Sequence, residues 1–302
     1  MREIHVLNLG AGVESTTLYL LSMQGKIPRF DAAVFADTQD EPGAEERRRG
    51  LPDPPESVYA HLDWLETLKG PPIIRRTRGC LSDDLMRGEN SSGQRFATIP
   101  AFTAEHEGET RPGQVRRQCT KEYKIEVIEQ AIRRDVLGLD PRKHVPAGVV
   151  VFQYIGISWG ERTRAFDIRR RFLDKQGHEK RKWKVRFSLL DLNGPNVPGW
   201  TRGDCENFLS LHVPHRVYGS SCIHCPYHDD AEWKRVLAMP ASGPRLIQID
   251  ATIRMPGIVV NRNLDASLYL HRSCVPMDRV KFKGDGDKQL GFVMECEGGC
   301  GL

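Results

Sequence analysis

The sequence lacks the features that would place a protein in or across a membrane. Its 302 residues contain no uncharged apolar run that approaches the roughly 18 residues of a transmembrane helix. The first residues, Met1–Leu7, show neither the apolar core nor the small-residue cleavage site of a secretory signal. We therefore expect a cytoplasmic protein with no membrane partner, in which the cysteines stay reduced.

Internal repeats, low-complexity tracts and a strong net charge are also missing. The formal net charge of +4 is too small to indicate nucleic-acid binding by itself. The positive residues form clusters, however, and such clusters attract phosphate groups. We interpret Arg169–Arg171 and Lys180–Lys184 as exposed charged loops, with a nucleic-acid contact as the alternative. We give weight only to clusters that lie beside a motif.

A strand, a glycine-rich turn and a helix follow one another near the start of the chain. Residues 4–9 are typical of a short strand, residues 16–21 of a helix and residues 32–36 of a second strand. This order indicates a parallel β-α-β unit. The turn between the first strand and the helix would present backbone N–H groups and the helix dipole to an anion. Phosphate binding is therefore expected there, although a turn that only joins the two elements would look similar.

Further segments predict a parallel sheet flanked by helices. Helical periodicity covers residues 58–68 and 121–134, and the apolar run 149–157 is typical of a buried strand. Ile73–Ile74 supplies a short third strand. The polar stretch 79–113 predicts a long loop or lid, since loops of that length are usually functional.

The C-terminal part is predicted to be less regular. Thr201 is the expected N-cap of a helix with Asp204 at its third position, and another helix is expected over residues 229–239. We divide the chain into an α/β nucleotide-binding domain, residues 1–215, and an irregular cysteine-containing lobe, residues 216–302. In a sheet of this kind the nucleotide binds at the carboxyl ends of the strands.

The eight cysteines include two pairs with short spacing. Two residues separate Cys222 from Cys225, so both thiolates can hold one metal or neighbouring irons. The same spacing fits a redox dithiol or half of a zinc site. His224, inside this pair, is expected to lie beside the ligands rather than to bind metal. Cys296 and Cys300 suit either a metal site or an attacking thiol. The remaining single cysteines are interpreted as small buried apolar side chains: Cys80, Cys205 and Cys274.

The glycine-rich turn resembles the pyrophosphate loop (PP-loop) of the adenine nucleotide alpha-hydrolase superfamily, whose pattern is Ser-Gly-Gly-X-Asp-Ser. The departures from that pattern are Gly10, Ala11 and Glu14. Residues 35–42 are similar to the second-strand segment of the phosphoadenosine phosphosulfate (PAPS) reductase branch. Residues 156–164 and 189–205 resemble later segments of the same branch, in the same order. The six places of the loop are filled by Gly10, Ala11, Gly12, Val13, Glu14 and Ser15.

The resemblance implies a Rossmann-like domain that binds ATP or another adenine nucleotide. Mg²⁺ is compatible with such a site as a further cofactor. Glu14, at the Asp place of the loop, becomes a catalytic candidate. The guanidinium groups of Arg116, Arg117, Arg162 and Arg164 lie beside the motifs and can grip phosphate or sulfate bidentately. Phosphate or sulfate binding is expected of Arg116, Arg117 and Lys124. The implied nucleotide contacts are Gly10, Ala11, Gly12, Val13, Glu14, Ser15, Thr16, Asp37, Thr38, Gly156, Arg162 and Arg164.

The resemblance also extends to an iron–sulfur site. In iron–sulfur adenylylsulfate reductases a Cys-Cys pair opens a helix, and a later pair with CxxC spacing completes the ligand set. Cys119 matches the first member of that pair, Lys124 matches the basic residue after it, and Thr120 replaces the second cysteine. Cys119, Cys222 and Cys225 would then hold a [4Fe–4S] cluster with one iron open. Zinc is the alternative metal.

The last residues, Met294–Leu302, resemble the mobile Glu-Cys-Gly-Leu tail of sulfonucleotide reductases. In those enzymes a single cysteine attacks the sulfur of the bound sulfonucleotide. Cys296 and Cys300 are therefore candidate nucleophiles, and either of them is equally a candidate fourth metal ligand.

Three functions follow from these resemblances. The leading one is a PAPS reductase-like transferase that adenylates an acceptor with ATP, releases pyrophosphate and transfers sulfur with an iron–sulfur centre. Its acceptor would be a small molecule or a nucleic acid such as tRNA or DNA, and a sulfur donor protein and a homodimer are compatible with it. The second is an oxidoreductase, a thiol-dependent PAPS or adenylylsulfate reductase with Cys296 or Cys300 as nucleophile. The third is a non-catalytic nucleotide-binding module with structural zinc.

Overall fold

The computed structural model describes residues 1–87, 99–110, 112–115, 118–141, 143–194, 197–255 and 266–282. Four residues with expected roles lie outside these ranges, and their roles stay predictions: Arg116, Arg117, Cys296 and Cys300. Within the described ranges, every helix is too short or too polar to span a bilayer.

A five-stranded parallel sheet forms the centre of the molecule, in the order β3-β2-β1-β6-β7. This confirms the α/β class that the sequence predicts. The chain passes from β1 towards β2 and β3 on one side, and from β6 towards β7 on the other. The strand order therefore reverses between β1 and β6, the point where α/β sheets usually bind ligands. The strands are β1 (Arg2–Asn8), β2 (Ala32–Asp37), β3 (Ile73–Thr77), β6 (Val149–Tyr154) and β7 (Trp183–Arg186).

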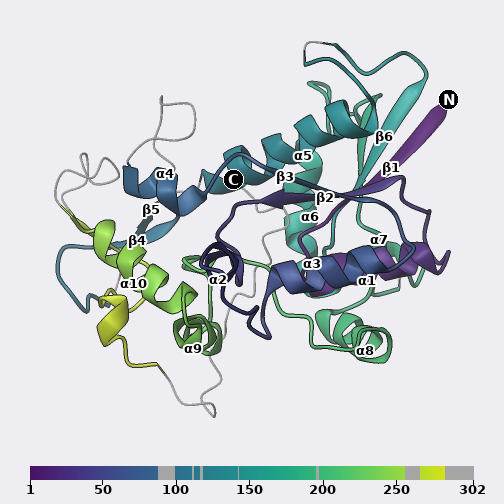
Figure 1. Cartoon of the computed structure of the whole chain (residues 1–302). Helices are drawn as coiled ribbons and strands as arrows, with labels where there is room; N and C mark the ends of the chain where they lie inside the picture. Colours follow the sequence, from purple (N-terminus) through teal and green to yellow (C-terminus); the bar gives the residue numbers. More distant parts are fainter. Residues whose placement is uncertain are drawn as a thin grey trace.

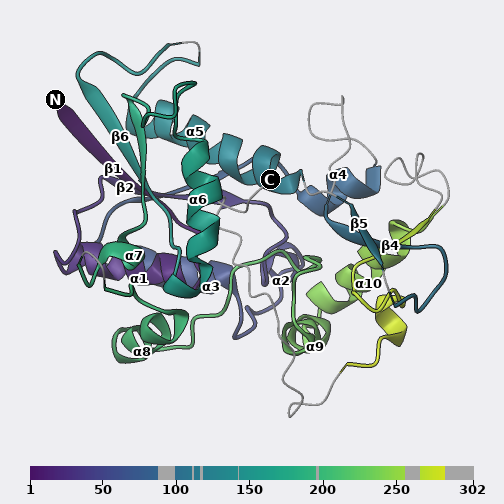
Figure 2. The ribbon, with the colours of Figure 1, turned by 180° about the vertical axis from the view of Figure 1, so that it is seen from behind.

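Helices cover both faces of this sheet (Figures 1 and 2). Alternate residues of β1 point to opposite faces: Leu7 packs in the cluster formed with α1, whereas Val6 packs against the helix that contains α5. One face carries α1 (Val13–Met23), α3 (Val58–Thr67), α7 (Ser188–Asp191) and α8 (Arg202–His212). The other carries the continuous helix η1 (Thr120–Ile125), α5 (Glu126–Ala131) and η2 (Ile132–Val136), together with η3 (Trp159–Glu161) and α6 (Arg162–Arg170).

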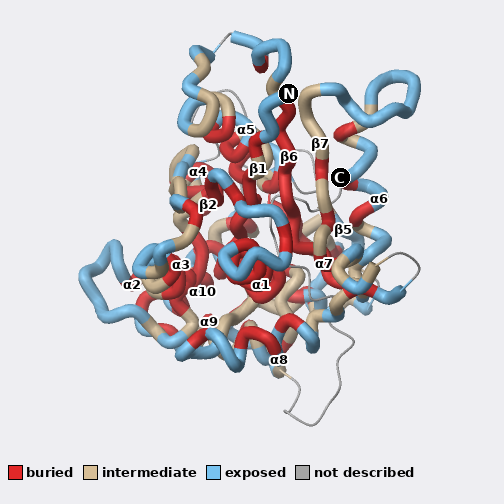
Figure 3. Tube along the Cα trace, turned by 90° about the vertical axis from the view of Figure 1, so that its right-hand side faces the viewer, coloured by how far each residue is buried: buried red, intermediate tan, exposed pale blue. Residues whose placement is uncertain are grey.

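Burial follows this layering. Strands β1 and β6 and helix α1 are largely buried in Figure 3, whereas the outer helices show exposed faces. The expected strand near 149–157 is thus present and covered on both faces. The expected cap of α8 is also confirmed, because the Thr201 hydroxyl accepts the Asp204 N–H and the Asp204 carboxylate accepts the Thr201 N–H.

A second group of elements packs beside the sheet, at the left of Figure 1. Its core contains Tyr123, Trp233 and Leu246, all fully buried. This core combines residues 81–123 with residues 222–282, so it reaches across position 215; the domain boundary there stays a prediction. The elements are α2 (Ala44–Arg48), α4 (Leu81–Arg87), α9 (Asp230–Ala238), α10 (Ser242–Thr252), η5 (Met277–Arg279) and an antiparallel sheet of β5 (Gly113–Val115), β4 (Ala101–Ala104) and β8 (Ser267–Tyr269).

Three expectations about local structure are wrong. The stretch 79–113, predicted to be a loop, contains α4 and β4, because Leu81, Leu85 and Ala101 are buried in the second core. The region after 239, predicted to be irregular, contains α10 and β8. The charged segments predicted as loops belong partly to α6 and β7, because each element buries one apolar face in a shared cluster.

Glu46 of α2 caps helix α10 across a long stretch of chain. Its carboxylate accepts the N–H groups of Ala241 and Ser242 at 3.0 and 2.8 Å and the Ser242 hydroxyl at 2.7 Å. Ala241 provides no side-chain cap of its own, and the first N–H groups of a helix need acceptors. Burial would raise the pKa of Glu46, but the hydrogen bonds from Ser242 and Ala241 outweigh it and hold that pKa below its usual value.

Replacing Glu46 by glutamine should lower stability at neutral pH by roughly 1–3 kcal/mol, since hydrogen bonds to a charged group are lost. The folded-state pKa is depressed, so this contribution is complete above the unfolded pKa of about 4.3 and disappears as the pH falls through the folded value. Denaturant unfolding of the wild type and the variant should therefore give a difference in unfolding free energy that becomes smaller as the pH is lowered. Glu105→Gln, at an exposed position, is the control, and an unchanged difference at low pH would contradict the assignment.

Candidate functional site

The glycine-rich turn lies between β1 and α1, at the carboxyl edge of the sheet. Gly12 precedes α1 in extended backbone, with φ −93° and ψ −171°, and its carbonyl accepts the Thr16 N–H at 3.0 Å. Ala11 has φ +61°, in the left-handed region that glycine adopts most readily. Glycine would adopt this backbone conformation at a lower cost than the alanine that is present. The first turn of α1 presents its N–H groups towards this edge.

Glu14 is buried in the first turn of α1, with 1% of its surface exposed. Its Oε2 atom lies 3.5 Å from Nη1 of Arg202, the first residue of α8. Arg202 also pairs with Glu206 on its own helix at 3.0 Å. A cation from α8 therefore stands beside the only acidic residue of the loop, which the sequence does not predict.

The end of β2 is held by a hydrogen bond to α3. Asp37 accepts the Tyr59 hydroxyl at 2.6 Å and the Gln39 N–H at 2.7 Å. Burial, followed by the negative charge of Asp37, raises the pKa of Tyr59, so the phenol stays protonated and donates. The next residue, Thr38, is buried and contacts Cys222. Asp37 and Thr38 thus lie at the sheet edge as expected, and their nucleotide contact stays a prediction.

The segment after β6 places its two arginines differently. Arg162 begins α6, donates to the Trp159 carbonyl at 3.2 Å and lies 5.2 Å above the Trp159 ring. Arg164 is largely buried and forms an ion pair with Glu161. Gly156 is the second residue after β6 and is buried. A phosphate contact of Arg164 would therefore compete with Glu161.

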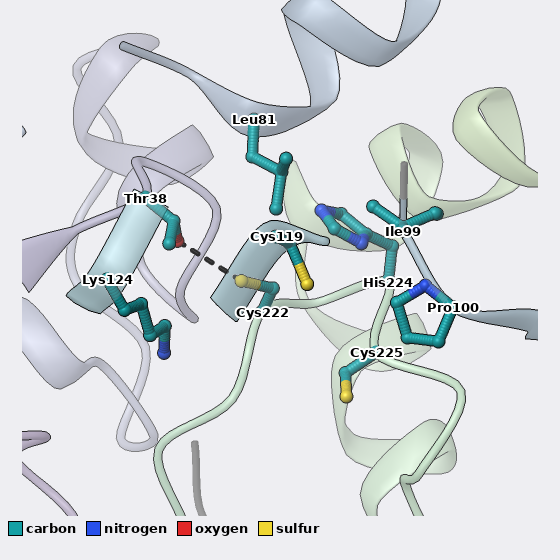
Figure 4. A pocket seen from close by; sticks show the side chains of 9 residues that line it. All are labelled: Thr38, Leu81, Ile99, Pro100, Cys119, Lys124, Cys222, His224 and Cys225. Carbon is teal, nitrogen blue, oxygen red and sulfur yellow. Dashed lines mark hydrogen bonds between the residues drawn. The ribbon is translucent and has the colours of Figure 1, made fainter. Parts of the chain in front are cut away.

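Three expected metal ligands line one cavity. Cys119 directly precedes η1, while Cys222 and Cys225 lie on a tight turn closed by the Cys225 N–H and the Cys222 carbonyl at 2.9 Å. In Figure 4 the sulfur of Cys222 points towards the Thr38 hydroxyl, and the sulfur of Cys225 points away from those of Cys119 and Cys222. The other lining residues are Thr38, Leu81, Ile99, Pro100, Lys124 and His224.

The donor set of this cavity suits iron–sulfur ligation, because each iron of a cluster takes a thiolate of its own. The cavity measures about 20 Å³, about the room of one water molecule. In the part of the chain that the structure describes, no three cysteine, histidine, aspartate or glutamate side chains are gathered closely enough for one metal ion. A cluster held by Cys119, Cys222 and Cys225 therefore requires the Cys225 side chain to turn inward.

Asp40 fixes the turn that carries Cys222 and Cys225. Its carbonyl accepts the Ile223 N–H at 2.7 Å, and its carboxylate lies 3.3 Å from Nε2 of His224. Ser82 donates to the same carboxylate through its N–H at 2.6 Å and its hydroxyl at 2.7 Å. Burial alone would raise the pKa of Asp40, but His224 and Ser82 outweigh it and lower that pKa. His224 thus lies beside the cysteines and is bound to an acid.

Glu41 and Lys124 form a buried ion pair next to the same cavity. Their Oε1 and Nζ atoms are 2.9 Å apart, and both side chains are almost fully buried. The Ser220 hydroxyl donates to the other oxygen of Glu41 at 3.3 Å. This pair ties the helix that follows Cys119 to the chain that leaves β2. The expected phosphate role of Lys124 stays a prediction, and any anion would share its ammonium with Glu41.

The other single cysteines differ in their surroundings. Cys205 and Cys274 are fully buried in apolar clusters, as small apolar side chains would be. Cys80 is buried but its sulfur lies 3.3 Å from Nη1 of Arg48 and 3.5 Å from Asp40. The sequence gives one signal for this polar network, the run of polar and acidic residues directly after a buried strand.

Replacing Lys124 by methionine should lower the free energy of unfolding by about 3–5 kcal/mol, because Glu41 would remain buried without its cation. Adding Glu41→Met to that variant should restore much of the loss, since both charges are then removed. Urea unfolding of the two single variants and the double variant measures the coupling. Arg279→Met breaks an exposed ion pair with Glu107 and should cost at most about 1 kcal/mol. An equally small effect of Lys124→Met would contradict the buried pair.

Comparison with known proteins assigns no family to the chain. No family model matches it, and no curated protein or solved structure matches it either. The fold is therefore established by the structure alone, and the similarity to the PAPS reductase-like branch stays a prediction.

Proposed function

We propose that the protein is a PAPS reductase-like enzyme that binds ATP at residues 10–16 and uses an iron–sulfur centre to transfer sulfur. The observation that carries the proposal is that Cys119, Cys222 and Cys225 line one cavity. Cys119 lies far from the other two in the sequence, and three reduced thiols around one cavity favour metal chemistry. Apolar walls from Leu81, Ile99 and Pro100 would shield such a centre from solvent.

The position of the cavity supports a link between nucleotide and thiols. Strands β1 and β2 are parallel neighbours, so the residues that follow them emerge at the same edge of the sheet. The glycine-rich turn follows β1, and Thr38 follows β2. The Thr38 hydroxyl lies 3.1 Å from the Cys222 sulfur. The proposed phosphate loop thus follows β1, and the proposed metal ligand Cys222 contacts the residue that follows the adjacent strand β2.

The chemistry that fits this arrangement has two steps. An oxygen of the acceptor attacks the α-phosphorus of ATP and pyrophosphate leaves, which converts that oxygen into a good leaving group. A sulfur nucleophile then attacks the acceptor, a carbon–sulfur bond replaces the carbon–oxygen bond, and AMP departs. The N–H groups of the turn and the Arg202 cation would hold the negative phosphates. A cluster held by Cys119, Cys222 and Cys225 would supply a binding place for the sulfur species.

Metal and sulfide analysis after anaerobic purification tests the centre. The wild-type protein should contain iron and acid-labile sulfide and absorb visible light as iron–sulfur proteins do. Cys119→Ala, Cys222→Ala and Cys225→Ala should each lose nearly all the iron, because a cluster rarely survives on two thiolates. Cys205→Ala is the matched control, since Cys205 is buried in the other core. Full iron in Cys119→Ala, or zinc without sulfide in the wild type, would contradict the proposal.

Nucleotide binding is tested by adding one methyl group to the loop. Gly12 has a backbone conformation that alanine also adopts, so Gly12→Ala should fold. Its ATP affinity should fall roughly tenfold or more, because a lost hydrogen bond to a charged group is worth about 1.5–3 kcal/mol. Pyrophosphate release from ATP should fall with it. Gly203→Ala adds the same group to α8 with only the Thr201 hydroxyl nearby and should bind ATP normally. A wild-type protein that binds no ATP would refute the proposal.

A further inference from the structure

Two buried carboxamides lie together in the centre of the sheet. Asn8 is the last residue of β1 and Gln153 is the last but one of β6, and they are 4% and 3% exposed. Nδ2 of Asn8 donates to Oε1 of Gln153 at 3.4 Å. Among the residues that the structure describes, Oδ1 of Asn8 and Nε2 of Gln153 meet no hydrogen-bond partner. A buried acceptor and a buried donor are thus left over.

This surplus does not depend on how the two amides are oriented. If the oxygen and nitrogen atoms of both amides are exchanged, Gln153 donates to Asn8 instead, and one donor and one acceptor still remain. Buried polar atoms without partners destabilise a folded protein, and they call for a ligand, an ion or a water molecule. Two apolar residues at these positions would stabilise the folded protein better than this pair does. A ligand group that both donates and accepts would satisfy both atoms.

The position of the pair matches the usual ligand crevice of such a sheet. The strand order reverses between β1 and β6, and ligands of open α/β sheets bind at the carboxyl ends of the strands on either side of that reversal. Asn8 is separated from the glycine-rich turn only by Leu9. Gln153 is followed within three residues by Gly156. Both amides share the face of the sheet that α5 and α6 cover, together with Val6 and Val151.

The chemistry of the pair restricts which part of a ligand it can take. Phosphate oxygens accept hydrogen bonds and donate none at neutral pH, so they would leave the carboxamide oxygen unsatisfied. A nucleobase edge or a ribose hydroxyl both donates and accepts. Asparagine and glutamine side chains pair with adenine in this way, through N6 and N7. The uncharged part of a nucleotide is therefore the complementary group.

We propose that Asn8 and Gln153 bind the nucleoside part of the ligand, while the turn at residues 10–16 holds its phosphates. This inference rests on the proposed ATP binding and adds the residues that recognise the uncharged part of the nucleotide. Two parts of ATP, the base and the ribose, place a hydrogen-bond donor beside an acceptor and could bind this pair. Nucleotide analogues distinguish them.

The test replaces each amide by an apolar side chain of similar size, in Asn8→Leu and Gln153→Met. Both variants should lose roughly tenfold or more in ATP affinity, measured by calorimetry, since one hydrogen bond of about 1.4 kcal/mol is a factor of ten. Affinity for inorganic pyrophosphate should stay unchanged, because it has no nucleoside. The thermal midpoint of the ligand-free protein should be equal or higher, because an unsatisfied polar group has been removed. Gln153→Met keeps the test valid if Asn8→Leu does not fold.

Ser22→Ala provides the control with the opposite signature. The Ser22 hydroxyl donates to the Pro28 carbonyl at 3.1 Å and accepts the Phe30 N–H at 2.9 Å, in the last turn of α1. Its removal should lower the thermal midpoint and leave ATP affinity unchanged. The thermal midpoint and the ATP affinity together thus distinguish a buried polar residue that stabilises the fold from a pair that binds a ligand.

Analogues identify the contacted group. Wild-type protein should lose affinity for purine riboside triphosphate, which lacks the 6-amino group, if the base is bound, and for 2′-deoxy- or 3′-deoxy-ATP if the ribose is bound. The preference should disappear in Gln153→Met. If both variants bind ATP like the wild type, or lose ATP and pyrophosphate affinity equally, this inference is overturned and the proposed function stands. If the wild type binds no ATP, both are overturned.

Discussion

The turn that leaves β2 carries the constraint on which the rest of the site depends. Asp40 and Glu41 are completely buried, and buried carboxylates are tolerated only when hydrogen bonds or a cation offset the loss of water. Their partners include Ser82 of α4, Lys124 of η1 and the chain from Ser220 to His224. Moving any of these segments away would remove hydrogen bonds or a cation from a buried carboxylate. The cavity between the cysteines is formed by the same segments.

This constraint also joins the two cores of the molecule. The acids belong to the strand edge of the parallel sheet, whereas Ser82 and His224 belong to elements that pack around Trp233 and Leu246. Glu46 repeats the arrangement a few residues later, where it caps α10. Charged hydrogen bonds depend on distance and direction, so they fix the relative position of the two cores more narrowly than apolar packing does. The cysteine cavity therefore lies beside charged contacts that join the two cores.

Local sequence signals predict only the elements whose stabilising contacts are themselves local. The apolar runs of β1, β2 and β6 and the capping box of Thr201 and Asp204 are visible in the sequence, and the structure has them. Helix α10 escapes prediction because its cap, Glu46, is far away in the chain. Strand β7 escapes because it buries only Val185 fully and its other residues are polar or partly exposed. In the site, the spacing of Cys222 and Cys225 is a local signal, whereas the pairs Asp40–His224 and Glu41–Lys124 exist only in the fold.

The distribution of charge along the sheet edge gives the final argument about the ligand. Glu14 places a negative charge in the loop where phosphates would bind, and Arg202 is the cation that offsets it. The neutral pair Asn8 and Gln153 lies at the carboxyl ends of β1 and β6, on the side of β1 that faces away from β2 and the thiol cavity. A ligand that fits such an edge has a charged end beside the glycine-rich turn and an uncharged, hydrogen-bonding part over β1 and β6. A nucleotide has this division of charge, whereas sulfate or pyrophosphate alone would leave the central pair unsatisfied.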